Sequence, residues 1–153
     1  LPAPVIARLV AMKLHAVGLR AAADLYPREL SGGMARRVAL ARALALDPPL
    51  MIYDEPLTGL DPIASGVIMA LIARLNASLG LTSIIVTHHV HETLPVADRA
   101  IVIANGRIVF SGTPEELQAS TDPLVGQFLR GEPDELFAAP RHDRTRAFLS
   151  KIL

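Results

Sequence analysis

The chain has 153 residues, of which 51% are hydrophobic and 20% charged, the balance of an ordinary globular domain rather than of a disordered chain. Its 15 basic residues match its 15 acidic ones, so no excess of positive charge points to a nucleic-acid partner. The absence of cysteine excludes a disulfide scaffold, a zinc ribbon and a thiol nucleophile. No uninterrupted apolar run reaches the roughly 18 residues that a membrane span needs.

Two helices are predicted in the first third of the chain. Apolar residues recur at helical spacing from Pro4 to Val17, and Gly18 ends that segment. A break at Tyr26-Pro27-Arg28 precedes a second helical pattern from Met34 to Leu46. The second helix ends at Asp47, because the two prolines that follow cannot continue it.

The next segments alternate between strands and helices. Leu50 to Tyr53 and Ser83 to Thr87 are short apolar runs, which are typical of fully buried parallel strands. A helix from Ile63 to Leu79, closed by Gly80, connects them, and a shorter helix is predicted from Val90 to Ala97.

A hairpin follows this strand and helix alternation. Ala100 to Ala104 and Arg107 to Ser111 flank Asn105-Gly106, which is the strongest two-residue hairpin signal. Together these elements predict an α/β fold whose sheet is mostly parallel, with an antiparallel hairpin at its edge.

The end of the chain contains a short repeat. The segment Gly112 to Ala119 recurs as Gly131 to Ala138, and a Phe-Leu pair closes each copy. Each copy places proline at the first helical position and acidic residues in the first turn, and Thr113 with Glu116 forms a capping box in the first. We therefore expect two helical appendages over residues 113–153.

Ser31-Gly32-Gly33 lies directly before a predicted helix. The two glycines expose backbone N–H groups at the positive end of the helix dipole, an arrangement that suits a phosphate. Taken alone, the segment is more often a plain helix cap after a turn, and that interpretation remains open.

Acidic and histidine residues follow the two predicted parallel strands. Asp54-Glu55 lies where ligands bind in open α/β sheets and suits an Mg²⁺ held through water, with a base for an attacking water. A strand-end acid pair that caps the next loop is the alternative. Thr87-His88 follows the second strand and is expected at the same edge. A metal site at His88, His89 and His91 is disfavoured, because neighbouring residues rarely converge on one ion and no acid completes the set.

Four motifs stand in a fixed order, and together they resemble the nucleotide-binding domain of ABC transporters. They are Leu30-Ser31-Gly32-Gly33, an apolar strand followed by Asp54-Glu55-Pro56, Gly59-Leu60-Asp61-Pro62, and Val86-Thr87-His88. The resemblance covers Pro4 to about Gly112. It implies a P-loop NTPase-like fold, with part of the helical subdomain and the signature helix over residues 1–47 and the catalytic core over 48–112.

The same resemblance implies a role for each matching residue. Asp54 corresponds to the acid that positions Mg²⁺ through water, Glu55 to the catalytic glutamate that polarises water, and His88 to the switch histidine that contacts the γ-phosphate of ATP. Ser31, Gly32 and Gly33 correspond to the signature motif and Asp61 to an acid at the dimer interface. Both are directed toward the ATP of a second subunit.

The sequence departs from the family pattern in two places. It contains no Gly-x-x-x-x-Gly-Lys-Ser/Thr loop, the phosphate-binding Walker A motif, so we expect that this chain alone holds ATP poorly. The chain begins with Leu1 rather than Met, and we expect it to be the remainder of something longer. His89 stands where the family often has aspartate.

Within the family, Leu1-Pro2-Ala3-Pro4 and the methionine at position 34 resemble ATPase subunits of systems that maintain lipid asymmetry. This implies a homodimeric ATPase that powers phospholipid transport beneath a permease, on the cytoplasmic face of the inner membrane. Residues 140–153 instead resemble ATPases of polar amino-acid importers, which is one alternative. A non-catalytic remnant that dimerises or docks on a permease is another. A soluble ABC ATPase of DNA repair or translation ranks last, because the chain has no long coiled-coil insertion.

Overall fold

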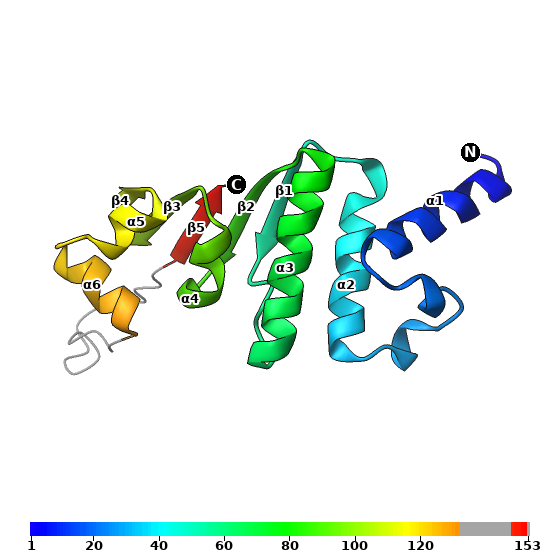
Figure 1. Cartoon of the computed structure of the whole chain (residues 1–153), viewed down its shortest axis with the longest axis horizontal. Helices are drawn as coiled ribbons and strands as arrows, with labels where there is room; N and C mark the ends of the chain where they lie inside the picture. Colours follow the sequence, from blue (N-terminus) through cyan, green and yellow to red (C-terminus); the bar gives the residue numbers. More distant parts are fainter. Residues whose placement is uncertain (132–147, 153) are drawn as a thin grey trace. The chain divides into compact units, whose positions relative to one another are not determined.

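A computed structural model describes residues 1–131 and 148–152. The chain forms two compact units (Figure 1). The first contains residues 1–51 and 56–82, and the second contains residues 52–55 together with the described residues from 83 onward. The division between the units therefore lies within the first predicted strand and its following loop.

The first unit is built from three helices: α1 (Ala3–Ala16), α2 (Gly32–Ala43) and α3 (Pro62–Leu79). All three confirm helices predicted from apolar spacing. Gly18 and Gly80 end α1 and α3 with φ angles of 71° and 62°, the left-handed conformation that glycine adopts without strain. The predicted end of the second helix becomes a short 3₁₀ turn at residues 44–46.

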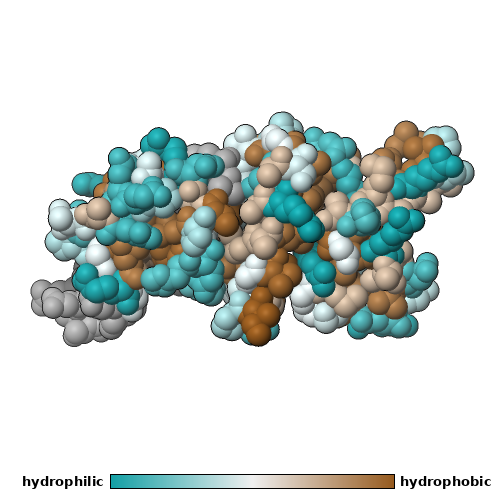
Figure 2. Space-filling view, in the orientation of Figure 1, coloured by the Kyte–Doolittle hydropathy of each residue, from teal (hydrophilic) through white to brown (hydrophobic). Residues whose placement is uncertain are grey.

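The core of the first unit is formed by residues of α2, α3 and the connecting segments, since no residue of α1 is buried. α2 contacts both α1 and α3. The buried apolar residues of the first unit are Val17, Leu19, Leu40, Ala41, Leu44, Met51, Leu57, Ile68, Met69, Leu71, Ile72 and Leu75. By length and composition α3 could cross a membrane. However, Arg74 interrupts it and six of its residues are buried, as in a core helix. Figure 2 shows hydrophobic surface along α3, where Ile63 and Val67 are exposed.

A mixed five-stranded sheet has the order β1-β2-β5-β3-β4. β1 and β2 run parallel: Thr82 donates to the carbonyl of Pro49 and Glu55 to that of Val86, so the bonds follow both strands in one direction. The strands are β1 (Leu50–Asp54), β2 (Thr82–Thr87), β3 (Arg99–Ala104), β4 (Arg107–Gly112) and β5 (Phe148–Ile152). The α/β class and the antiparallel hairpin are confirmed.

The position of β5 was not predicted. It lies between β2 and β3 and is antiparallel to both (Figure 1). Ser150 stands opposite Val86 on one side and Ile101 on the other. The predicted second appendage is therefore not helical at Phe148–Ile152, because two neighbouring strands offer this segment backbone partners that a helical repeat does not reveal. Residues 132–147, where the rest of that appendage falls, lie outside the described residues.

Local capping signals are realised as expected in the rest of the second unit. Asn105 and Gly106 have φ angles of 53° and 71°, so the hairpin uses the tight turn that their sequence predicts. In α5 (Pro114–Gln118) the backbone N–H of Glu116 donates to Thr113 Oγ1 at 3.2 Å, and the N–H of Thr113 donates to the Glu116 carboxylate at 2.8 Å. α6 (Pro123–Arg130) follows and ends at Gly131.

The core of the second unit packs β3 against helical segments that precede and follow it in the chain. Its central cluster consists of Val90, Leu94, Ala100, Val102, Leu117 and Val125. Val90 belongs to α4 (Val90–Thr93), which continues as a 3₁₀ turn at residues 94–96. β1 differs from the prediction of burial on both faces, because Ile52 is 64% exposed while Tyr53 is buried. Leu50 and Asp54, which share the face of β1 with Ile52, are exposed as well.

Candidate functional site

Two strand ends bring the predicted acidic and histidine residues together in the second unit. Asp54 ends β1 and Thr87 ends β2, and these strands are neighbours in the sheet. The backbone N–H of Glu55 donates to the carbonyl of Val86 at 2.8 Å. This hydrogen bond continues the parallel ladder by one residue and fixes the backbone of Glu55 beside the end of β2.

The side chains of Glu55 and His88 are in direct contact. Oε1 of Glu55 lies 2.9 Å from Nδ1 of His88, although 33 residues separate them in the sequence. The Glu55 side chain is 29% exposed and that of His88 58% exposed, so both reach solvent. The hydrogen bond fixes the position of the carboxylate while leaving it open to a water molecule or a ligand.

The backbone of Glu55 is strained. Its φ angle is 47°, a left-handed conformation that a residue with a Cβ rarely adopts. Such a conformation costs roughly 1–2 kcal/mol and persists where the surrounding structure holds it. Here the hydrogen bonds to Val86 and His88 hold it, and the strained turn directs the carboxylate toward the end of β2.

His89 lies beside Glu55 and His88, a position that was not predicted from the sequence. Its imidazole lies 4.3 Å from that of His88, measured between ring centroids. The ligand atoms of Glu55, His88 and His89 all lie within 4.8 Å of one another. The sequence did predict that Glu55 and His88 meet at one sheet edge. No local signal shows that His89 turns to the same side.

Tyr53 lies one residue before the acid pair, on the buried face of β1. Burial raises the pKa of its hydroxyl, an effect that a hydrogen bond with Ser83 opposes. The hydroxyl is therefore neutral at physiological pH, and Tyr53 adds no negative charge beside Asp54 and Glu55. Asp54 itself is exposed, so its carboxylate is available to a hydrated cation.

In the first unit, Ser31 caps α2. Its Oγ accepts a hydrogen bond from the backbone N–H of Met34 at 3.3 Å, so the capping interpretation of this residue is correct locally. Open space surrounds the two glycines that follow, because a Cβ added to Gly32 or Gly33 would meet no atom within 4 Å. The glycines are therefore not required by packing, and they leave the helix N-terminus accessible.

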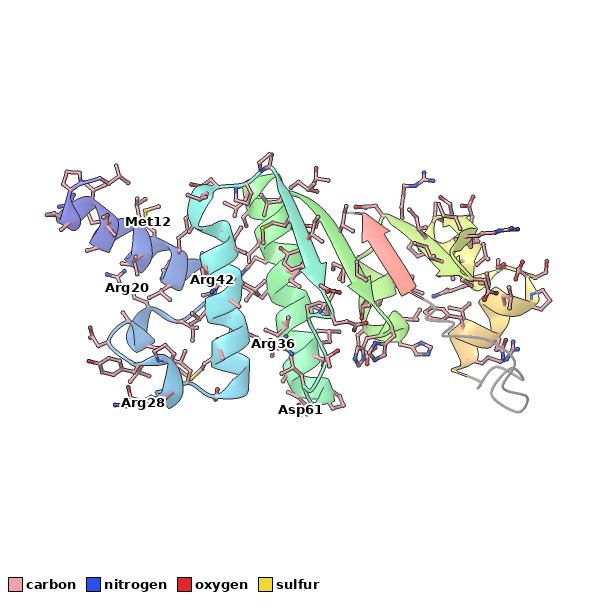
Figure 3. The ribbon with its side chains drawn as sticks, turned by 180° about the vertical axis from the view of Figure 1, so that it is seen from behind. Met12, Arg20, Arg28, Arg36, Arg42 and Asp61 are labelled. Carbon is pink, nitrogen blue, oxygen red and sulfur yellow. The ribbon has the colours of Figure 1, made fainter. Side chains whose placement is uncertain are left out.

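Asp61 occupies the corresponding position at α3. Its Oδ1 accepts from the N–H of Ala64 at 2.9 Å, and Figure 3 shows it at the end of that helix. The loop before it is tied to α2, because Arg36 donates from Nη2 to the carbonyl of Thr58 at 2.6 Å (Figure 3). The pattern of the sequence did not indicate this positioning role of Arg36.

The family of the chain is identified by its similarity to known proteins. Residues 7–58 match the family model described as ABC transporter. A component of an ABC transporter complex from Clostridium perfringens has a solved structure that is 34% identical, with a TM-score of 0.74 over 85% of this chain and 52% of that one. The chain belongs to the ABC transporter family of ATP-binding proteins.

Two curated relatives show which branches of the family are similar. The chain is 59% identical to the intermembrane phospholipid transport system ATP-binding protein MlaF of Haemophilus influenzae. The match extends over 134 residues, or 88% of this chain. The chain is 39% identical over 153 residues to the methionine import ATP-binding protein MetN of Rhodospirillum rubrum. The chain spans only 51% of the first relative and 38% of the second, about half of their length or less.

Proposed function

We propose that this chain forms the signature and catalytic half of an ATP-hydrolysing subunit that powers phospholipid transport between membranes. The observation that carries the proposal is the 59% identity to the phospholipid transport protein over 134 of the 153 residues, a span long enough to contain the described site. The chain spans only about half of this relative, so hydrolysis, cofactors, substrate and partners are all part of the proposal.

Glu55 is the proposed general base. Its carboxylate accepts a proton from the attacking water, while the hydrogen bond to His88 holds the acceptor oxygen in place. When both ring nitrogens of His88 carry a proton, Nδ1 donates to Glu55 and Nε2 of the exposed imidazole can donate to a phosphate oxygen. The exposed Asp54 carboxylate fits a hydrated Mg²⁺, which in phosphoryl transfer neutralises the charge on the phosphates.

The first unit supplies the complementary binding surface. Ser31, Gly32 and Gly33 present an accessible helix N-terminus, which attracts the phosphates of an ATP bound by a second copy. Asp61 stands at an exposed helix start and is the proposed contact with that copy. We therefore infer a homodimer that works beneath a membrane permease, at the cytoplasmic face of the inner membrane.

Import of a polar amino acid is the second candidate. The methionine import protein aligns with all of this chain, whereas the phospholipid transport protein aligns with 88% of it. The identity is higher for the phospholipid relative, 59% against 39%. The phospholipid assignment therefore takes precedence.

The test is a hybrid protein. The 134 matching residues of the Haemophilus influenzae relative are replaced by those of this chain, so that the hybrid has the length of the relative. ATP hydrolysis by the hybrid is then compared with that of its Glu55→Gln variant. We expect ATP binding to persist and hydrolysis to fall by at least about 100-fold, the contribution of a general base.

Glu92→Gln is the matched control, because it makes the same change of charge at an exposed position on α4. Its hydrolysis rate should equal that of the hybrid. Unchanged hydrolysis in Glu55→Gln would overturn the general-base assignment. For the substrate, the hybrid is placed in cells that lack the relative. Recovery of phospholipid transport supports the assignment, and failure alongside normal ATP hydrolysis refutes it.

A further inference from the structure

Glu55, His88 and His89 form a cluster of three metal-binding side chains at the ends of β1 and β2. The proposed hydrolysis uses the first two and leaves His89 without a role. Two imidazoles and a carboxylate are a donor set that Mg²⁺ does not select, because Mg²⁺ prefers oxygen ligands. The same set suits Zn²⁺, which binds histidine nitrogen and carboxylate oxygen.

Hydrogen bonds hold the backbone of His89 from both sides. Its N–H donates to Thr87 Oγ1 at 3.0 Å, and its carbonyl accepts from Thr93 Oγ1 at 2.6 Å. Both threonines are fully buried, so these contacts belong to the core. The backbone of Glu55 is bonded to the carbonyl of Val86 in the same way. The backbone N–H of Val90 donates to the carbonyl of His88 at 3.1 Å, so all three ligands start from held backbone positions, which reduces the ordering needed to bind an ion.

The distances are close to those of a metal site. Ligand atoms at 2.0–2.2 Å from a tetrahedral Zn²⁺ lie roughly 3.3 Å apart. Glu55 and His88 already stand 2.9 Å apart, and no pair among the three ligand atoms exceeds 4.8 Å. Rotation of the exposed His88 and the partly exposed His89 side chains closes the remaining gap. Three protein ligands leave the fourth position of zinc to water.

We propose that Glu55, His88 and His89 form a zinc-binding site. Binding of Zn²⁺ engages the carboxylate and the imidazole that the proposed hydrolysis requires, so zinc also inhibits that reaction. The inhibition depends on the proposed function, whereas the binding of zinc does not.

The first experiment measures zinc binding by the chain without an affinity tag and without nucleotide. Zn²⁺ is titrated in competition with a chromophoric chelator. We expect one Zn²⁺ per chain, and a loss of affinity of about 10- to 100-fold or more in His89→Ala. His91→Ala is the matched control, because His91 lies two residues further along on an exposed position outside the cluster. Its affinity should stay within about twofold of the unchanged protein.

A second measurement does not depend on the variant folding correctly. Histidine side-chain NMR of the unchanged protein, with and without Zn²⁺, should show shifts at His88 and His89 and none at His91. Equal affinity in the unchanged protein and His89→Ala, or shifts confined to His91, would overturn the zinc site. Neither result bears on hydrolysis by the hybrid protein, so the two proposals fail separately.

Discussion

Asp61 offers a test that separates a structural role from a functional one. The start of an α-helix leaves four backbone N–H groups without intrahelical hydrogen-bond partners, and α3 is no exception. Pro62 has no N–H, Ser65 makes the first intrahelical bond to the carbonyl of Asp61, and Ala64 donates to the Asp61 carboxylate. Asp61→Ala removes only the last of these bonds, together with a negative charge at the positive end of the helix.

The expected loss of stability in Asp61→Ala is the sum of these two contributions. Loss of an N-cap hydrogen bond costs about 1 kcal/mol, and loss of the charge costs about 0.3–1 kcal/mol. Asp61→Ala should therefore lower the free energy of unfolding by about 1–2 kcal/mol. Asp61→Asn keeps an oxygen acceptor and loses only the charge, so it should lower it by less than 1 kcal/mol.

Urea unfolding of the chain, monitored by helical circular dichroism at low and high salt, measures both variants. The deficit of Asp61→Asn should shrink in high salt, because salt screens the charge, whereas most of the deficit of Asp61→Ala should remain. Equal stability of Asp61→Ala and the unchanged protein would refute the capping role. A functional role at the dimer interface would then be the better explanation of this aspartate.

Three further predictions concern the second unit. Because burial raises the folded-state pKa of Tyr53, its contribution to stability is present below pH 10 and is lost as the pH rises further. In Tyr26→Phe, where Tyr53 is the remaining tyrosine, ultraviolet titration should therefore give a midpoint above 10, and a midpoint at or below 10 would contradict this. Ser150→Pro removes an N–H that can bond only one of the two neighbouring strands, so amide exchange should accelerate in β2 or in β3. If exchange changes in neither, β5 does not pair there. Thr113→Ala breaks the capping box of α5 and should cost about 1 kcal/mol in urea unfolding; Ser120→Ala is the comparison and should cost less.

Elements that depend on neighbouring residues could be predicted from the sequence. Gly80 ends α3 and the Asn105-Gly106 pair turns the hairpin, because each φ angle is a property of one or two residues. The meeting of Glu55 and His88 was also predictable, since the ends of adjacent parallel strands lie at one edge.

The features that could not be predicted depend on contacts that the spacing of residues along the chain does not reveal. β5 gains its pairing from strands far earlier in the chain, so its own residues carry little sign of it. His89 reaches the cluster because two buried threonines fix its backbone, and their hydrogen bonds are invisible in the spacing of histidines. The exposure of Ile52 depends on what covers the sheet, not on the apolar run that contains it.

The place of β5 also sets an order of events in folding. β2 and β3 are separated by β5 and do not pair with each other, so each keeps an open edge until Phe148–Ile152 has been synthesised. Pairings between such distant segments slow folding, because a long loop must close before they form. During that interval the two open edges can pair with strands of other chains. A delay between synthesis of β3 and of β5 therefore exposes the nascent protein to aggregation, and folding yield should depend on how quickly the ribosome completes this interval.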